Sequence, residues 1–181
     1  MDLPAGHLLI LSGHPGSGKT TLGEALATLP GCAKVHLHSD DFWGYIKTGR
    51  IEPWLPASEH QNRMIMEIAA GVAGTYARNG YFVALDGVIR PWALPPFRQL
   101  GVPTHYVVLR TSVGEAVARC QARGGDSLTD PEVVAEWHGQ FADLGPFEPH
   151  VLDLAGLDRP RALAAVTEAL SSGRFRLEAT A

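Results

Sequence analysis

Short, almost wholly apolar runs alternate along this chain with longer stretches in which apolar residues recur every three or four positions. Runs of the first kind are typical of parallel strands covered on both faces, and stretches of the second kind are typical of amphipathic helices. The predicted strands are residues 7–12, 34–38, 81–86, 105–109 and 150–154, and the predicted helices are residues 19–28, 58–79, 113–123, 130–143 and 159–170. This alternation predicts an α/β sandwich with a five-stranded parallel sheet.

The composition fits one domain over residues 1–181, because this length can bury a sizeable core and no linker divides it. A formal net charge of −4 makes nucleic acid an unlikely partner. The apolar run at residues 8–11 is too short for a signal peptide or a membrane span. Cys32 and Cys120 are isolated, without CxxC spacing, which favours a reducing compartment. We therefore expect a cytoplasmic protein with no membrane association.

The most specific signal is a complete GxxxxGK[ST] motif that follows the first predicted strand and opens the first predicted helix. Glycine lets such a loop turn tightly, so that backbone amides and a helix N-terminus surround polyphosphate oxygens. The residues predicted to bind the nucleotide here are Gly13, His14, Pro15, Gly16, Ser17, Gly18, Lys19, Thr20 and Thr21. The side chain at the intervening position 14 is expected to face outward.

Two side chains of this motif have specific tasks. Lys19 is predicted to be catalytic, as a cation at the β- and γ-phosphates; without an anion it would oppose the dipole of the helix that it opens. Thr20 is predicted to ligate a Mg²⁺ ion that bridges the same phosphates. The loop therefore predicts a nucleotide and Mg²⁺.

The loop alone does not decide between a GTPase, a hydrolytic ATPase and a kinase. The chain has no Asn-Lys-x-Asp run for guanine, and Asp86 is followed by Gly87 where a hydrolytic ATPase usually carries a Glu that orients water. A kinase needs a carboxylate for the acceptor hydroxyl, and Asp40 stands at the carboxyl end of the second predicted strand. We therefore predict ATP as the nucleotide and Asp40 as general base or hydroxyl-orienting residue.

A structural role competes with the catalytic one at this strand end. Ser39, Asp40 or Asp41 could instead cap a helix that begins at Phe42. Asp41 is also a candidate for contact with the substrate.

The phosphate loop, the Ser39-Asp40-Asp41 run and the Asp86-Gly87 pair together resemble the P-loop small-molecule kinases, a group that includes gluconate kinase, shikimate kinase and chloramphenicol phosphotransferase. The resemblance spans about residues 8–170. It implies the P-loop three-layer fold, a role for Asp40 at the acceptor hydroxyl, and a place for Asp86 and Gly87 beside the substrate.

The resemblance also implies a mobile, arginine-containing lid, which matches residues 119–130. Arginine suits this position because its planar group stacks on adenine and binds phosphate oxygens in pairs. Arg123 is the candidate for charge stabilisation during transfer, and Arg119 is the candidate for covering the adenine. A solvated helix face is the alternative for both.

The acceptor pocket is expected between the second and third strands and in the loop after the third. Trp43, Arg50, Arg63 and Arg90 are its candidate substrate-binding residues. Core packing for the tryptophan and surface positions for the arginines remain open alternatives. His36 and His38 alternate along a predicted strand, which favours packing over a metal site.

Together these patterns predict a kinase that transfers the γ-phosphoryl group of ATP to a hydroxyl of a small molecule. The departure from the shikimate kinase pattern after the third strand, where this chain has Val88-Ile89-Arg90 instead of further glycines, argues against shikimate as the acceptor. One alternative is an ATP-binding sensor without transfer. Another is a polynucleotide 5′-hydroxyl kinase. Such an enzyme needs a basic groove, and the chain has only three lysines. The acceptor, and the choice between monomer and homodimer, stay open.

Overall fold

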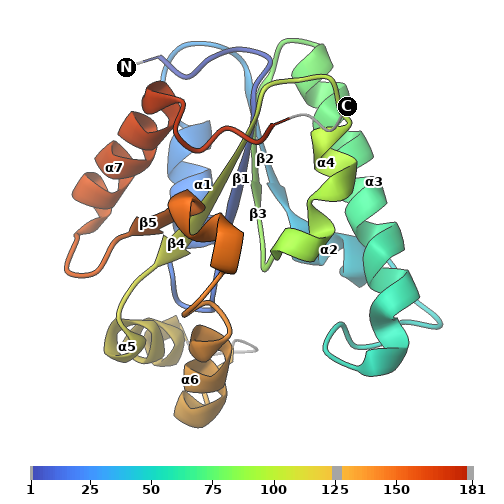
Figure 1. Ribbon diagram of the computed structural model, residues 1–181, viewed down its shortest axis with the longest axis vertical. Helices are drawn as coiled ribbons and strands as arrows, with labels where there is room; N and C mark the ends of the chain where they lie inside the picture. The colour runs from blue at the N-terminus through green and yellow to red at the C-terminus, as the bar shows by residue number, and fades with distance from the viewer. Residues whose placement is uncertain (1, 124–127, 179–181) are drawn as a thin grey trace.

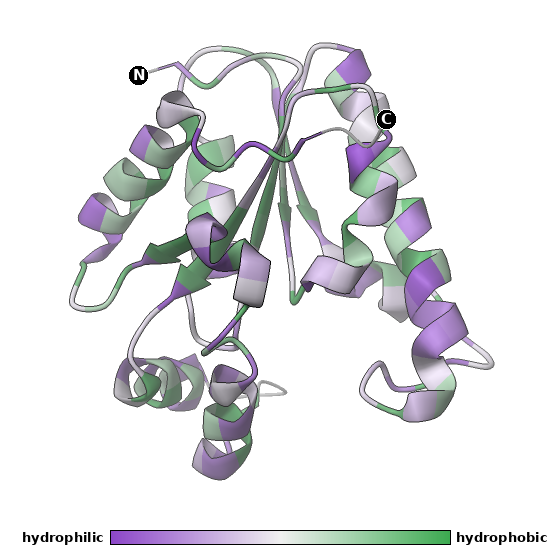
Figure 2. Ribbon diagram, in the orientation of Figure 1, coloured by the Kyte–Doolittle hydropathy of each residue, from purple (hydrophilic) through white to green (hydrophobic). Residues whose placement is uncertain are grey.

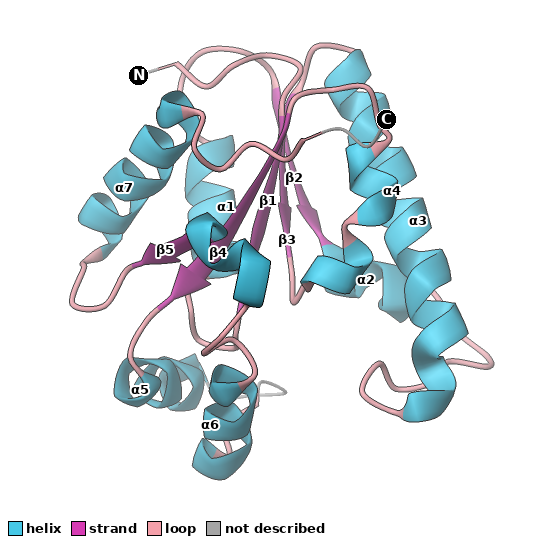
Figure 3. Ribbon diagram, viewed as in Figure 1, coloured by secondary structure: helices cyan, strands magenta, loops and turns pink. Residues whose placement is uncertain are grey.

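A computed structural model describes residues 2–123 and 128–178 and contains a five-stranded, all-parallel sheet with the strand order β2-β3-β1-β4-β5 (Figures 1 and 3). The strands are β1 Leu8–Gly13, β2 Lys34–His38, β3 Phe82–Asp86, β4 Thr104–Arg110 and β5 Val151–Asp153. The α-helices are α1 Lys19–Ala27, α2 Ser39–Gly44, α3 Glu59–Arg78, α4 Pro95–Arg98, α5 Val113–Arg123, α6 Pro131–Gly139 and α7 Arg159–Ser172. Short 3₁₀ helices cover Pro56–Ser58, Pro91–Ala93 and Gly145–His150. The predicted fold class is confirmed.

The inner strands β1, β3 and β4 are buried on both faces because they are largely apolar (Figure 2), whereas the edge strands β2 and β5 are only partly buried. On one face, alternate strand residues such as Leu8 and Val83 pack against α3 and α4. On the other face, their neighbours Leu9 and Phe82 pack against α1 and α7. The result is three layers, helix, sheet and helix, in which Asp86 lies on the α1 face at the end of β3.

The central strand β1 lies between β3 and β4. The chain fills one side of β1 with β2 and β3, and then crosses over to form β4 and β5 on the other side. Ligands of open α/β sheets bind at such a switch point, outside the carboxyl ends of the strands. The loop from Gly13 to Lys19 leaves β1 at this end, and α2, α5 and α6 lie at the same end of the molecule (Figure 1).

Two local predictions need correction. Helix α2 begins at Ser39, directly after the strand, so no side chain of residues 39–41 caps it and its N-cap residue is His38. Helix α6 ends at Gly139 rather than at residue 143, because residues 141 and 142 turn back with bonds to the carbonyl groups of His138 and Gly139. Within the described residues, no helix has the length and apolar content to cross a membrane.

Candidate functional site

The loop after β1 has the backbone shape of an anion cradle. Gly16 has a φ of 77°, and a Cβ there would lie 2.4 Å from the carbonyl oxygen of Ala116. A Cβ on Gly13 would come equally close to the carbonyl oxygen of Leu109. Neither position tolerates a side chain, so the close passage of the loop past α5 and β4 depends on glycine.

Lys19 opens α1 from inside this cradle. Its side chain is buried, and its ammonium group donates to the carbonyl oxygen of His14 at 2.9 Å. Burial lowers the pKa of Lys19 to about 8, while the charges of Asp86 and Asp40 oppose that shift. The Ser17 hydroxyl is also buried and has no hydrogen-bond partner among the described residues. A buried cation and an unused hydroxyl donor in a glycine-rich loop at a helix N-terminus fit a polyphosphate anion.

His14 does not face outward as predicted. Its ring is fully buried, accepts at Nε2 from the backbone amide of Thr111 at 3.3 Å, and packs against His138 with ring centroids 4.5 Å apart. The Nδ1–H group donates to the carbonyl oxygen of Pro15. Burial lowers the pKa of His14 to about 4, so the ring is neutral and ties the loop to the start of α5 and to α6.

Thr20 and Asp86 join α1 to β3. The Thr20 hydroxyl donates to Asp86 Oδ2 at 2.5 Å, which leaves the hydroxyl lone pairs free. Oxygen ligands suit Mg²⁺, so Thr20 fits the role predicted for it. Both oxygens of Asp86 already accept hydrogen bonds, so its part is to orient Thr20.

Two histidines of β2 complete the surroundings of Asp86, although their alternation along the strand predicted only a packing role. His38 Nδ1 lies 2.7 Å from Asp86 Oδ1, and His36 Nε2 lies 3.2 Å from the same oxygen. Asp86 is fully buried, yet hydrogen bonds from both histidines and from Thr20 hold its pKa far below the usual range. The signal was the i, i+2 spacing of the histidines, which places both on one face of β2, beside the end of β3.

Asp40 and Asp41 lie in the first turn of α2. The Asp40 side chain is 67% exposed, and its Oδ2 lies 3.5 Å from His38 Nε2. Ser39 Oγ lies 3.4 Å from its other oxygen. Asp40 is thus an accessible carboxylate at the carboxyl end of β2, one strand away from Asp86 and near enough to Lys19 to raise its pKa.

The two predicted arginines of the lid lie on α5. Arg119 Nη1 is 3.4 Å from the carbonyl oxygen of Gly16, and Arg119 also pairs with Glu115. Arg123, the last residue of α5, lies near enough to Lys19 to lower its pKa. Both are therefore beside the phosphate loop. Residues 124–127 of the predicted lid lie outside the described residues.

Three further acceptor candidates already have partners within the protein. The Trp43 ring is buried in the core and donates to Asn62 Oδ1. Arg50 and Arg63 form surface ion pairs with Glu52 and Glu59.

The loop after β3 holds the other predicted acceptor residues. Arg90 donates to Gln140 Oε1 and lies over the ring of Phe141, so it joins this loop to the segment after α6. Gly87 lies against Ser39, at the junction of β3 and α2.

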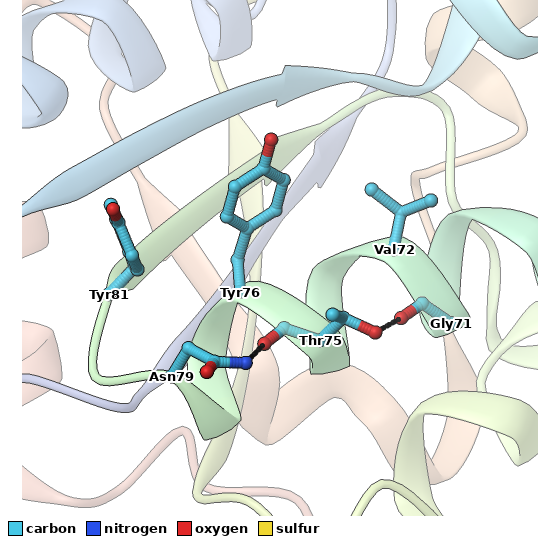
Figure 4. Close-up of a pocket in the computed structure, with 6 residues that line it drawn as sticks. All are labelled: Gly71, Val72, Thr75, Tyr76, Asn79 and Tyr81. Carbon is cyan, nitrogen blue, oxygen red and sulfur yellow. Dashed lines mark hydrogen bonds between the residues drawn. The ribbon is translucent and has the colours of Figure 1, made fainter.

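A surface pocket elsewhere on the molecule does not belong to this site. Residues of α3 and Tyr81, just before β3, line it, and bonds within α3 order its wall (Figure 4). Tyr81 precedes the amino end of β3, whereas Asp86 ends that strand. The pocket is therefore at the opposite end of the sheet from the phosphate loop.

A parallel sheet of this order, with a glycine-rich loop and a buried lysine after its central strand, defines the class of P-loop α/β proteins. The family model for an AAA domain (AAA_33) matches residues 8–144, and the chain belongs to that family. A search of curated proteins finds no match.

Solved structures share this fold over nearly the whole chain. A gluconokinase from Sinorhizobium meliloti 1021 is 15% identical with a TM-score of 0.68, and 97% of this chain and 98% of that chain are covered. The tunicamycin resistance protein of Deinococcus radiodurans is 15% identical with a TM-score of 0.64, covering 96% and 98%. Shikimate kinase from Acinetobacter baumannii, in complex with shikimate, is 23% identical with a TM-score of 0.59, covering 94% of each chain. The predicted resemblance to P-loop small-molecule kinases is confirmed in the fold.

Proposed function

We propose that this protein is a kinase that transfers the γ-phosphoryl group of Mg-ATP to a hydroxyl of a small molecule. The observation that carries the proposal is the meeting of three groups at one end of the sheet. Lys19 lies in the phosphate loop, the Thr20–Asp86 pair lies beside it, and the accessible Asp40 carboxylate follows the neighbouring strand β2. Charge stabilisation and a base for the acceptor are the two requirements of phosphoryl transfer.

Each group then has a defined task. Lys19 and the amides of the loop hold the phosphates, and Arg123 and Arg119 approach the same loop from α5. A Mg²⁺ ion held by Thr20 would neutralise charge on the β- and γ-phosphates. Asp40 accepts the proton of the acceptor hydroxyl while the oxygen of that hydroxyl forms a bond to phosphorus and the bond from phosphorus to the ADP oxygen breaks. Positioning and charge, rather than covalent chemistry by the protein, supply the rate.

The charges around Asp40 favour an acceptor that is not an acid. Of the three arginines predicted to bind the substrate, Arg50 and Arg63 are already paired with glutamates, and Arg90 is bonded to Gln140. Asp40 and Asp41 are exposed carboxylates that would repel an anion. We therefore propose a neutral or cationic polyhydroxyl acceptor, in preference to a sugar acid. Cys32 and Cys120 are free thiols, consistent with a reaction in the cytoplasm.

The test is ADP release from Mg-ATP across a panel of neutral, cationic and acidic hydroxyl compounds, beside a blank without acceptor. Release that requires one acceptor, and that Lys19→Ala and Asp40→Asn abolish, would support the proposal. Lys34→Ala is the matched control, because Lys34 lies at the other end of β2 and donates to the backbone carbonyl groups of Pro30 and Cys32. This control is expected to keep the full rate.

Other outcomes would identify a different function. Equal ADP release with and without acceptor would indicate an ATPase. ATP binding without release on any compound would indicate a sensor that holds the nucleotide. A requirement for an acidic acceptor would leave the kinase in place and refute the argument from Asp40 and Asp41.

A further inference from the structure

A continuous line of polar contacts runs from the phosphate loop to the proposed base. The Thr20 hydroxyl contacts Asp86 Oδ2 at 2.5 Å, Asp86 Oδ1 contacts His38 Nδ1 at 2.7 Å, and His38 Nε2 lies 3.5 Å from Asp40 Oδ2. We refer to Thr20, Asp86, His38 and Asp40 as the polar chain. Its first member comes from α1, and its last belongs to α2, so it crosses from the phosphate side of the site to the acceptor side.

Two glycines make room for this arrangement. A Cβ on Gly23, in the middle of α1, would lie 2.5 Å from His36 Nε2, the atom that contacts Asp86. A Cβ on Gly87 would lie 1.8 Å from the Oγ of Ser39, the residue that separates His38 from Asp40. Glycine inside a helix lowers stability. Its presence at position 23 is explained by the space that the His36 ring needs to contact Asp86.

The protonation of the polar chain follows from its geometry. An ionised carboxylate only accepts hydrogen bonds, so His38 Nδ1 and His36 Nε2 must both carry hydrogen toward Asp86. His38 Nε2 is then the free position of that ring, and it faces Asp40. The hydrogen bond to Asp86 raises the pKa of His38 against the opposing effect of burial, and the charges of Asp86, Asp40 and Asp41 add to the rise.

We infer that His38 is a positioning residue, oriented by Asp86, that holds the Asp40 carboxylate in place for the acceptor hydroxyl. This inference rests on the proposed function, because it gives Asp40 its role as base. In its charged form the ring donates from Nδ1 to Asp86 and from Nε2 to Asp40. One oxygen of Asp40 is thereby fixed, and its other oxygen, which has only a long contact of 3.4 Å with Ser39 Oγ, can accept from the acceptor hydroxyl. An exposed aspartate on the first turn of a short helix would otherwise turn freely.

The first test needs no acceptor. The imidazole nitrogens of His38 are titrated by NMR in the full-length protein and in the Asp40→Asn and Asp41→Asn variants. Asp41 is the matched control, since it is adjacent and charged; its effect on His38 is through charge alone. The expected result is an Nδ1–H signal that persists throughout and a pKa of His38 that falls further in Asp40→Asn than in Asp41→Asn. An equal decrease of the His38 pKa in both variants would overturn the inference, because Asp40 would then act on His38 only through its charge and not through a direct contact.

The second test uses the acceptor found by the panel. Asparagine at position 38 can keep the bond to Asp86 in place of Nδ1–H, whereas glutamine can reach toward Asp40 in place of Nε2–H. His38→Asn is expected to keep its melting temperature and its ATP affinity, yet to lose kcat by on the order of tenfold to a hundredfold. His38→Gln is expected to retain the larger share of kcat.

The pH profile separates positioning from structure. The charged ring holds Asp40, so wild-type kcat should fall as pH rises through the pKa of His38, and this step should vanish in His38→Asn. Lys19, whose pKa is about 8, titrates in both proteins, so its step should remain in His38→Asn. Equal kcat in the two variants, or an unchanged profile, would overturn the inference. If no compound of the panel is phosphorylated while the NMR result holds, the kinase proposal fails and the contact between His38 and Asp40 stands.

Discussion

Replacing Gly23 with alanine should destabilise this protein, although the same change stabilises most helices. Gly23 lies in the middle of α1, and a Cβ there would meet His36 Nε2 at 2.5 Å. The ring can move away, but only by leaving Asp86, to which that nitrogen is bonded at 3.2 Å. The substitution therefore loses a hydrogen bond to the buried Asp86 carboxylate and gains the higher helix propensity of alanine.

The two effects differ in size. Alanine in place of glycine inside a helix is worth about 0.5–1 kcal/mol. A hydrogen bond to a charged group contributes about 1.5–3 kcal/mol, and Asp86 is fully buried, so little water can replace the lost donor. We expect a net loss of about 1–2 kcal/mol, or a fall of about 3–6 °C in the melting temperature of a chain of this length.

Urea and thermal unfolding of matched variants would measure this loss. Gly71→Ala, in the middle of α3, is the control, because a Cβ there meets nothing within 4 Å, and it should stabilise the protein by about 0.5–1 kcal/mol. In a His36→Ala background, Gly23→Ala should also become stabilising, because the ring that it displaces is gone. If Gly23→Ala alone stabilises the protein as much as Gly71→Ala does, the reasoning is refuted.

Three further predictions concern the same structure. Lys19→Met should abolish ATP binding yet stabilise the ligand-free protein by up to about 3 kcal/mol, because burial lowers the pKa of Lys19 to about 8; the gain should shrink from about pH 8 to 10.5 in urea unfolding. Burial lowers the pKa of His105 to about 4, so between pH 6.5 and 4 the unfolded chain binds a proton at this residue and the native protein does not. The free energy of unfolding should therefore decrease from pH 6.5 to about 4, and the decrease should be smaller in His105→Gln. Gly87→Ala should displace Ser39 and α2, costing about 1–3 kcal/mol and lowering kcat more than ATP affinity, and Ser39→Gly should restore part of the loss.

The parts of this structure that could be predicted from the sequence have local causes. The strands β1 to β4 are apolar runs, and the phosphate loop is a pattern of neighbouring residues, so their positions follow from the chain itself. The position of Asp40 beside the loop followed from the rule that the strand ends face the ligand.

The surroundings of Asp86 could not be predicted in the same way. His38 lies opposite Asp86 only because β2 pairs with β3 in one register, which depends on the order of strands in the sheet. Alternation with leucine gave the histidines the pattern of packed residues. The inward position of His14 likewise depends on the amide of Thr111, 97 residues further along the chain.

The two halves of the site differ in how far their polar groups are satisfied, and this difference indicates where the ligand charge must enter. Asp86 accepts hydrogen bonds from Thr20 and from both histidines of β2, so this half is already assembled. In the phosphate loop, by contrast, the Ser17 hydroxyl has no partner among the described residues, and Lys19 bonds to a carbonyl of its own loop. An anion would relieve both, since it would accept a hydrogen bond from Ser17 and offset the cost of burying the charge of Lys19. The free energy of nucleotide binding should therefore come chiefly from the loop, and the histidine half should act on the rate of transfer.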